Sequence, residues 1–180
     1  MVSKTQRFSA GFCISLAIIL LIVPFSWLVS MLIAAAFHEI CHLGAIRVLS
    51  GKTGRVYFRL AGPRIDLPEL SPGREALCAL SGPLGGLLLL LLVDVFPKLA
   101  ICGLIQSVYN LLPMYPLDGG RALRSILSMM LPPPKVKQYV RVIEFLCRMG
   151  ILAAGIWGCF WGGFGLLSFL VCMVIVIRVK

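Results

Sequence analysis

Two long apolar tracts constrain this chain more than any other feature of its sequence. They cover residues 8–46 and residues 139–177. A helix needs about 20 apolar residues to cross the hydrocarbon core of a membrane, so each tract is long enough for two crossings. The composition agrees, because 59% of the residues are hydrophobic and only 13% are charged, unlike a soluble domain. We therefore expect an integral, all-α polytopic membrane protein.

Further apolar runs and turn signals predict about six transmembrane helices in all. The first tract is expected to turn at residues 24–26, where proline is followed by phenylalanine and serine. The middle of the chain supplies two more spans, residues 76–93 and 99–112. The second tract supplies the last two spans, with a turn among the glycines near its centre.

The segments between the spans allow more than one interpretation. Residues 47–75 are basic and rich in turn signals, and residues 55–60 alternate enough to predict a short β-strand or hairpin between spans two and three. The proline-rich segment 131–137 is expected not to be helical. A rival interpretation makes residues 139–148 an amphipathic surface helix, which leaves five spans instead of six.

Basic residues are placed asymmetrically about the predicted spans. The net charge is +10, but Lys and Arg fall mostly between apolar runs, which is typical of cytoplasmic loops and argues against nucleic-acid binding. In the six-span arrangement only Lys98 lies in a loop on the side opposite the N-terminus, while Arg141 and Arg148 fall within span five. Both termini are therefore expected to be cytosolic, in a multi-pass protein of the cell membrane.

The two histidines of the chain, His38 and His42, lie four residues apart with Glu39 beside the first. On a helix this spacing places both imidazoles on one face. Two imidazoles on one face can bind Zn²⁺, and Glu39 is then placed to accept a proton from a water nucleophile. Cys41 lies within the same motif but is expected to pack as a small apolar residue. The simpler alternative is two core histidines hydrogen-bonded to backbone.

A hydrolytic zinc site usually has a third protein ligand. The best candidate is Asp118, because two prolines and two glycines surround it and break the helix at the end of span four. Irregular backbone at membrane depth is tolerated where it lines a protein or water cavity, so Asp118 can face inward. The alternatives are that Asp118 is only a turn residue, or that Glu144 of span five is the third ligand.

Taken together, these motifs resemble the site-2 protease family of intramembrane zinc metalloproteases. The resemblance rests on the HExxH motif at residues 38–42, Ser-Gly-Pro at 81–83 and the segment 110–121, and is strongest to the stage IV sporulation protease FB type. It covers roughly residues 30–125. It implies that His38, His42 and Asp118 bind one Zn²⁺ and that Glu39 is the general base. It also suggests that Asn110 contacts the substrate backbone or the oxyanion.

The resemblance also implies a function. We expect a single intramembrane metalloprotease domain over residues 1–180, with its core at 30–125, a C-terminal helical hairpin at 139–177, and no PDZ or CBS domain. Its reaction is hydrolysis of a peptide bond in or next to a transmembrane segment of a membrane protein substrate, as in regulated intramembrane proteolysis. The substrate and any inhibitory or oligomeric membrane partner are not identified. The alternative is a catalytically inactive zinc-binding membrane scaffold or carrier.

Overall fold

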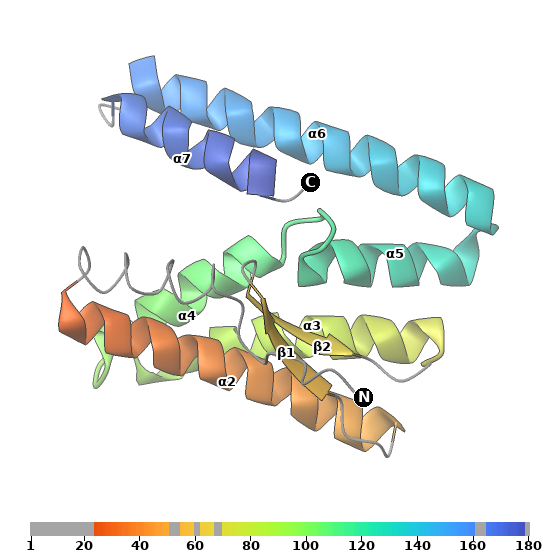
Figure 1. The fold of residues 1–180 in the computed structure, drawn as a ribbon, viewed down its shortest axis with the longest axis horizontal. Helices are drawn as coiled ribbons and strands as arrows, with labels where there is room; N and C mark the ends of the chain where they lie inside the picture. Colours follow the sequence, from red (N-terminus) through yellow and green to blue (C-terminus); the bar gives the residue numbers. More distant parts are fainter. Residues whose placement is uncertain (1–23, 51–54, 60–61, 67–69, 161–164, 179–180) are drawn as a thin grey trace, which may run out of the picture. The chain divides into compact units, whose positions relative to one another are not determined.

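The computed structural model describes residues 24–50, 55–59, 62–66, 70–160 and 165–178, and it is mainly helical (Figure 1). The predicted first span lies outside the described residues, as do Gly162 and Gly163 of the predicted turn in the second tract, whereas Gly158 of that turn is part of a helix. The elements are α2 (Phe25–Ser50), β1 (Arg55–Arg59), β2 (Gly62–Asp66), α3 (Pro72–Leu88), the 3-10 helix η1 (Leu89–Leu92), α4 (Pro97–Asn110), α5 (Asp118–Met130), α6 (Pro133–Phe160) and α7 (Gly165–Arg178).

The chain divides into two compact units. The first contains α2, the two strands, the second half of α3 from Ser81, η1, and α4 as far as Ser107. The second contains the first turns of α3, Pro72–Leu80, and everything from Val108 onward. The helix α3 therefore contributes residues to both units.

Three helices of the described residues are long and apolar enough to cross a membrane: α2, α3 with η1, and α6. They coincide with the second, third and fifth predicted spans. The helices α4 and α7 coincide with the fourth and sixth predicted spans, but each has 14 residues and is shorter than a full crossing. Within the described residues, the structure thus supports a membrane protein without establishing six spans.

In the first unit, α2 and α4 begin at the same end. Lys98, in the first turn of α4, donates a hydrogen bond of 2.7 Å to Ser26 Oγ in the first turn of α2. The Lys98 ammonium also lies 5.9 Å from the centre of the Trp27 ring, within cation–π range. The first turns of α2 and α4 therefore lie next to each other.

Small residues let α3 and α4 approach closely. A Cβ atom added at Gly103 would lie 2.7 Å from the Gly86 carbonyl oxygen and 2.9 Å from Leu89 Cδ1. A Cβ atom at Gly86 would overlap the hydroxyl of Ser107, which is fully buried. Without a strong hydrophobic driving force in lipid, helices associate through such close backbone packing.

In the second unit, α6 packs against α7 and α5 (Figure 1). The prediction that residues 131–137 are not helical is wrong, because α6 begins at Pro133. The backbone N–H groups of Lys135 and Val136 donate to the Pro132 carbonyl, so the helix starts directly after it. Proline is tolerated in the first turn because the missing N–H groups have no partner there in any helix. Residues 139–148 are part of this same continuous helix.

The strands β1 and β2 pair in an antiparallel ladder that runs from Arg55 opposite Asp66 to Arg59 opposite Gly62. They form a sheet of two strands between α2 and α3 in the sequence. Each strand has one edge that the other does not cover, and a two-stranded sheet is marginal without further packing or pairing.

The close approach of α3 and α4 predicts that Gly86→Ala destabilises the protein. The added methyl group overlaps Ser107, and overpacking of this kind costs about 1–3 kcal/mol of unfolding free energy. Thermal unfolding in detergent should show a lower Tm. The matched control is Gly44→Ala on α2, because among the described residues nothing packed against this helix position lies within 4 Å of the added Cβ. Equal Tm values for the two variants would contradict this packing.

Candidate metal centre

The two histidines lie on the buried face of α2. This face consists of Ala34, His38, His42 and Ile46, spaced four residues apart, together with Leu28 nearer the start of the helix. The side chains of His38 and His42 are only 3% and 5% exposed. Burying a polar side chain among apolar ones is costly unless it finds partners, so both imidazoles are placed for polar contacts inside the protein.

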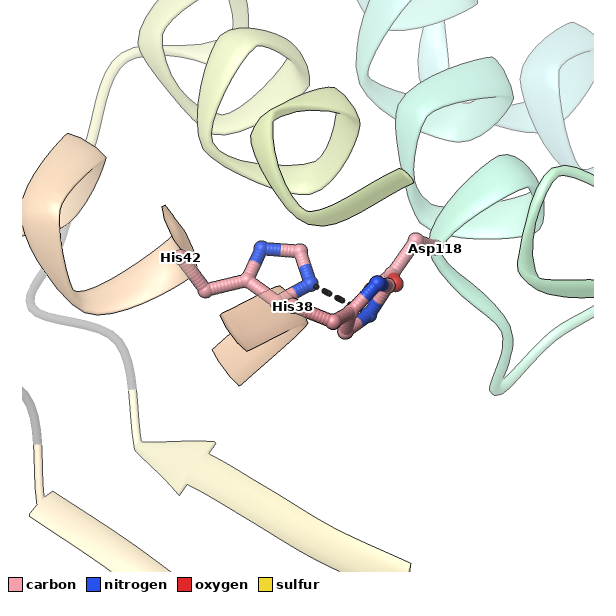
Figure 2. A group of neighbouring side chains, drawn as sticks. All are labelled: His38, His42 and Asp118. Atoms are coloured by element: carbon pink, nitrogen blue, oxygen red, sulfur yellow. Dashed lines mark hydrogen bonds between the residues drawn. The ribbon is translucent and has the colours of Figure 1, made fainter. Parts of the chain in front are cut away.

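The two imidazole rings turn the same nitrogen toward each other. His42 Nε2 lies 3.1 Å from His38 Nε2, and the ring planes are nearly perpendicular at 86° with their centres 4.7 Å apart (Figure 2). Two nitrogens bound to Zn²⁺ at about 2.0–2.1 Å in a tetrahedral site are separated by about 3.3–3.4 Å. The observed separation is therefore close to that of two histidine ligands sharing one ion.

Asp118 is positioned within the second unit by a tightly folded break between two helices. The helix α4 ends at Asn110 and α5 begins at Asp118. The intervening chain folds on itself through hydrogen bonds from Met114 N to Leu112 O (2.7 Å) and from Leu117 N to Met114 O (2.9 Å). These bonds satisfy backbone groups that the interrupted helix leaves free, as an apolar environment requires.

The two glycines after Asp118 are necessary for this arrangement. A Cβ atom at Gly119 would overlap the backbone of Leu111, and one at Gly120 would overlap the backbone at Met114. The first turn of α5 therefore lies directly on the preceding segment. Asp118 is only 8% exposed as a result, and its Oδ1 lies 3.5 Å from the Arg121 guanidinium one turn later.

His38, His42 and Asp118 come together as a group that can hold a metal ion. Each offers one ligand atom, and these atoms all lie within 4.8 Å of one another (Figure 2). All three residues are buried. Two neutral imidazoles and one carboxylate match the ligands of hydrolytic zinc sites, which leave a fourth position for water or substrate. The donor set therefore fits Zn²⁺, and the role of these three residues as zinc ligands stays a prediction.

Glu144, the rival third ligand, has a different partner. Its Oε1 accepts a hydrogen bond of 3.0 Å from the backbone N–H of Tyr115. Both residues belong to the second unit, so α6 anchors the segment that precedes Asp118. Asp118 belongs to the group that could hold a metal ion, whereas Glu144 contacts the segment that precedes Asp118. The sequence pattern shows Glu144 within an apolar span, but it does not identify this backbone partner.

The two remaining predicted residues lie close to these elements. Glu39 is half-buried on α2, next to His38, and its role as a general base stays a prediction. Asn110 is the last residue of α4 and is also half-buried. It precedes the segment that leads to Asp118, and its contact with a substrate stays a prediction.

Comparisons with known proteins agree with this description. A model of Peptidase family M50 matches residues 90–152, which is less than half of the chain and includes Asp118 but not the histidine motif. The structure is similar to that of the site-2 protease from Methanocaldococcus jannaschii, with a TM-score of 0.66 and 19% sequence identity over 96% of this chain and 87% of that one. A search of curated proteins finds no significant match.

The fold is therefore similar to that of a site-2 protease, and the family match covers the segment that contains Asp118. The stage IV sporulation FB type, which the sequence also suggested, is not distinguished by these comparisons. Together they support a site-2 protease-like metallopeptidase.

The third ligand can be tested with two matched variants that each replace a carboxylate by an amide. We expect Asp118→Asn to lose most of its zinc, and Glu144→Gln to keep it, because a glutamine oxygen can still accept from the Tyr115 N–H. The measurement is the zinc content of the purified protein by elemental analysis. Loss of zinc from Glu144→Gln with retention in Asp118→Asn would reverse the assignment.

Proposed function

We propose that this protein is an intramembrane zinc metalloendopeptidase that hydrolyses a peptide bond in or next to a transmembrane segment of a membrane protein. The observation on which this rests is the buried group of His38, His42 and Asp118, whose ligand atoms lie within 4.8 Å of one another. Glu39 beside this group adds the acid–base function that a simple metal store does not need. The family match and the fold provide independent support.

The chemistry divides between the metal and the side chains. A zinc ion supplies Lewis acidity, which polarises the scissile carbonyl and lowers the pKa of a water molecule towards about 7. His38 and His42 would hold the ion through an unprotonated ring nitrogen, since a protonated nitrogen has no lone pair for a metal. Glu39 accepts a proton from the attacking water and later donates it to the leaving amine. Asn110 is proposed to contact the substrate backbone or the oxyanion.

The position of the histidines along α2 indicates the class of substrate. With α2 ending at Ser50, His42 and His38 lie about 12 Å and 18 Å from that end, at about 1.5 Å per residue. A peptide reaches this depth if it is itself embedded in the membrane or enters from the adjacent aqueous side. The amide bonds of a spanning helix are hydrogen-bonded to one another, so cleavage requires local unwinding.

We propose that the site opens toward the cytosol and that both termini are cytosolic.

Replacing Glu39 tests the catalytic role directly. Glu39→Gln should retain zinc but reduce cleavage of a membrane-embedded model substrate by at least about a hundredfold, because general acid–base catalysis contributes about 10²–10⁴-fold. Elemental analysis and a gel-based cleavage assay measure the two quantities. The matched control is Glu75→Gln on α3, which is expected to cleave normally. Undiminished cleavage by Glu39→Gln would end the protease proposal, and zinc binding without cleavage by the unmodified protein would favour the scaffold.

The strands β1 and β2 provide a second element for the substrate. An unwound peptide can add to the edge of a sheet through main-chain hydrogen bonds, and a sheet of two strands has edges to offer. We propose that the hairpin binds the unwound segment in this way.

Deleting residues 55–60 tests this role of the hairpin. The deletion should slow cleavage of the model substrate about tenfold or more, while zinc content stays unchanged because both histidines and Asp118 remain. Cleavage rates across a range of substrate concentrations are the measurement. An unchanged rate at every concentration would remove the hairpin from substrate binding.

A further inference from the structure

The ring of His42 has a polar neighbour at each of its two nitrogens. Nε2 faces His38 Nε2 at 3.1 Å, and Nδ1 lies 3.4 Å from the hydroxyl oxygen of Ser81 on α3. A neutral imidazole has one N–H and one free lone pair. If Nε2 binds a metal, the proton must be on Nδ1, and the Ser81 hydroxyl is then the acceptor.

The residue after Ser81 brings α3 against this ring. Gly82 is buried, and a Cβ atom added to it would overlap the His42 imidazole, with Cε1 at 2.6 Å and Cδ2 at 2.7 Å. The backbone of α3 therefore lies directly against the ring. The two adjacent residues have different uses, since Gly82 leaves room for the ring and Ser81 offers its hydroxyl to the ring nitrogen.

We infer that Ser81 is a positioning residue for the metal centre, and this inference rests on the proposed function. Its hydroxyl accepts a hydrogen bond from His42 Nδ1, which fixes the tautomer with a free lone pair on Nε2 and holds the plane of the ring. Metal-binding histidines commonly donate their other N–H to a carboxylate, carbonyl or water, and removing that partner typically weakens metal binding 10–100-fold. A neutral hydroxyl does this without another buried charge in an apolar helix.

The inference is tested by zinc affinity in the full-length protein carrying Glu39→Gln, so that turnover does not affect the readout. Zinc dissociation constants are measured by competition with a chromophoric chelator. The variant Ser81→Ala should bind zinc about tenfold more weakly, the lower end of the usual range because 3.4 Å is a long hydrogen bond. Ser81→Thr keeps the hydroxyl and should restore most of the affinity.

The matched control is Ser107→Ala on α4. Ser107 is fully buried in the same unit, and its hydroxyl has no hydrogen-bond partner among the described residues. The same chemical deletion there should leave zinc affinity unchanged. The visible spectrum of bound Co²⁺ provides a second readout, because a reoriented imidazole should shift the bands in Ser81→Ala but not in Ser107→Ala.

The possible outcomes separate the role of Ser81 from the proposed protease function. Zinc affinity of Ser81→Ala within twofold of its parent would overturn the role of Ser81 while leaving the proposed protease intact. A drop in Tm together with equal losses in Ser81→Thr and Ser81→Ala would show a packing role and would also overturn it. If neither the Glu39→Gln parent nor the unmodified protein bound zinc at all, the proposed function itself would be overturned.

Discussion

Two imidazoles and a carboxylate share one buried position in a chain of largely apolar helices, and this constraint explains much of the surrounding structure. Each of these groups is costly to bury alone. A divalent cation bound by all three groups would offset the cost of burying each of them. The spacing of the two histidines along α2 is enough to place both imidazoles on one face. The carboxylate comes from another part of the chain, at the break between α4 and α5.

The break itself depends on small residues and on backbone hydrogen bonds. Gly119 and Gly120 let the first turn of α5 lie on the preceding segment, and Glu144 of α6 accepts a hydrogen bond from that segment at Tyr115. Within the first unit, Gly82 lets the backbone of α3 lie against the His42 ring. Gly82, Gly119 and Gly120 thus allow close approach next to residues of the candidate centre, whereas Gly86 and Gly103 allow close packing of α3 and α4.

The parts of the site that depend on local periodicity could be predicted from the sequence. The spacing of His38 and His42 placed both rings on one helix face, and the prolines and glycines around Asp118 indicated an inward-facing break. The helix α5 was not predicted, because Gly119 and Gly120 favour a turn when tertiary packing is unknown. The start of α6 at Pro133 was missed because three prolines were treated as a block, although the first turn tolerates them. The contact of Glu144 with Tyr115 joins distant segments, which no local pattern reveals.

The central claim is that one zinc ion is bound by two imidazoles and one carboxylate. X-ray absorption at the zinc edge, on the full-length protein with one equivalent of Zn²⁺, tests it most directly. The expected spectrum contains only nitrogen and oxygen neighbours at about 2.0–2.1 Å, with the multiple scattering of two imidazoles. A sulfur neighbour at about 2.3 Å would identify a cysteine such as Cys41 as a ligand, and that result, or the signature of fewer than two imidazoles, would contradict the proposed centre.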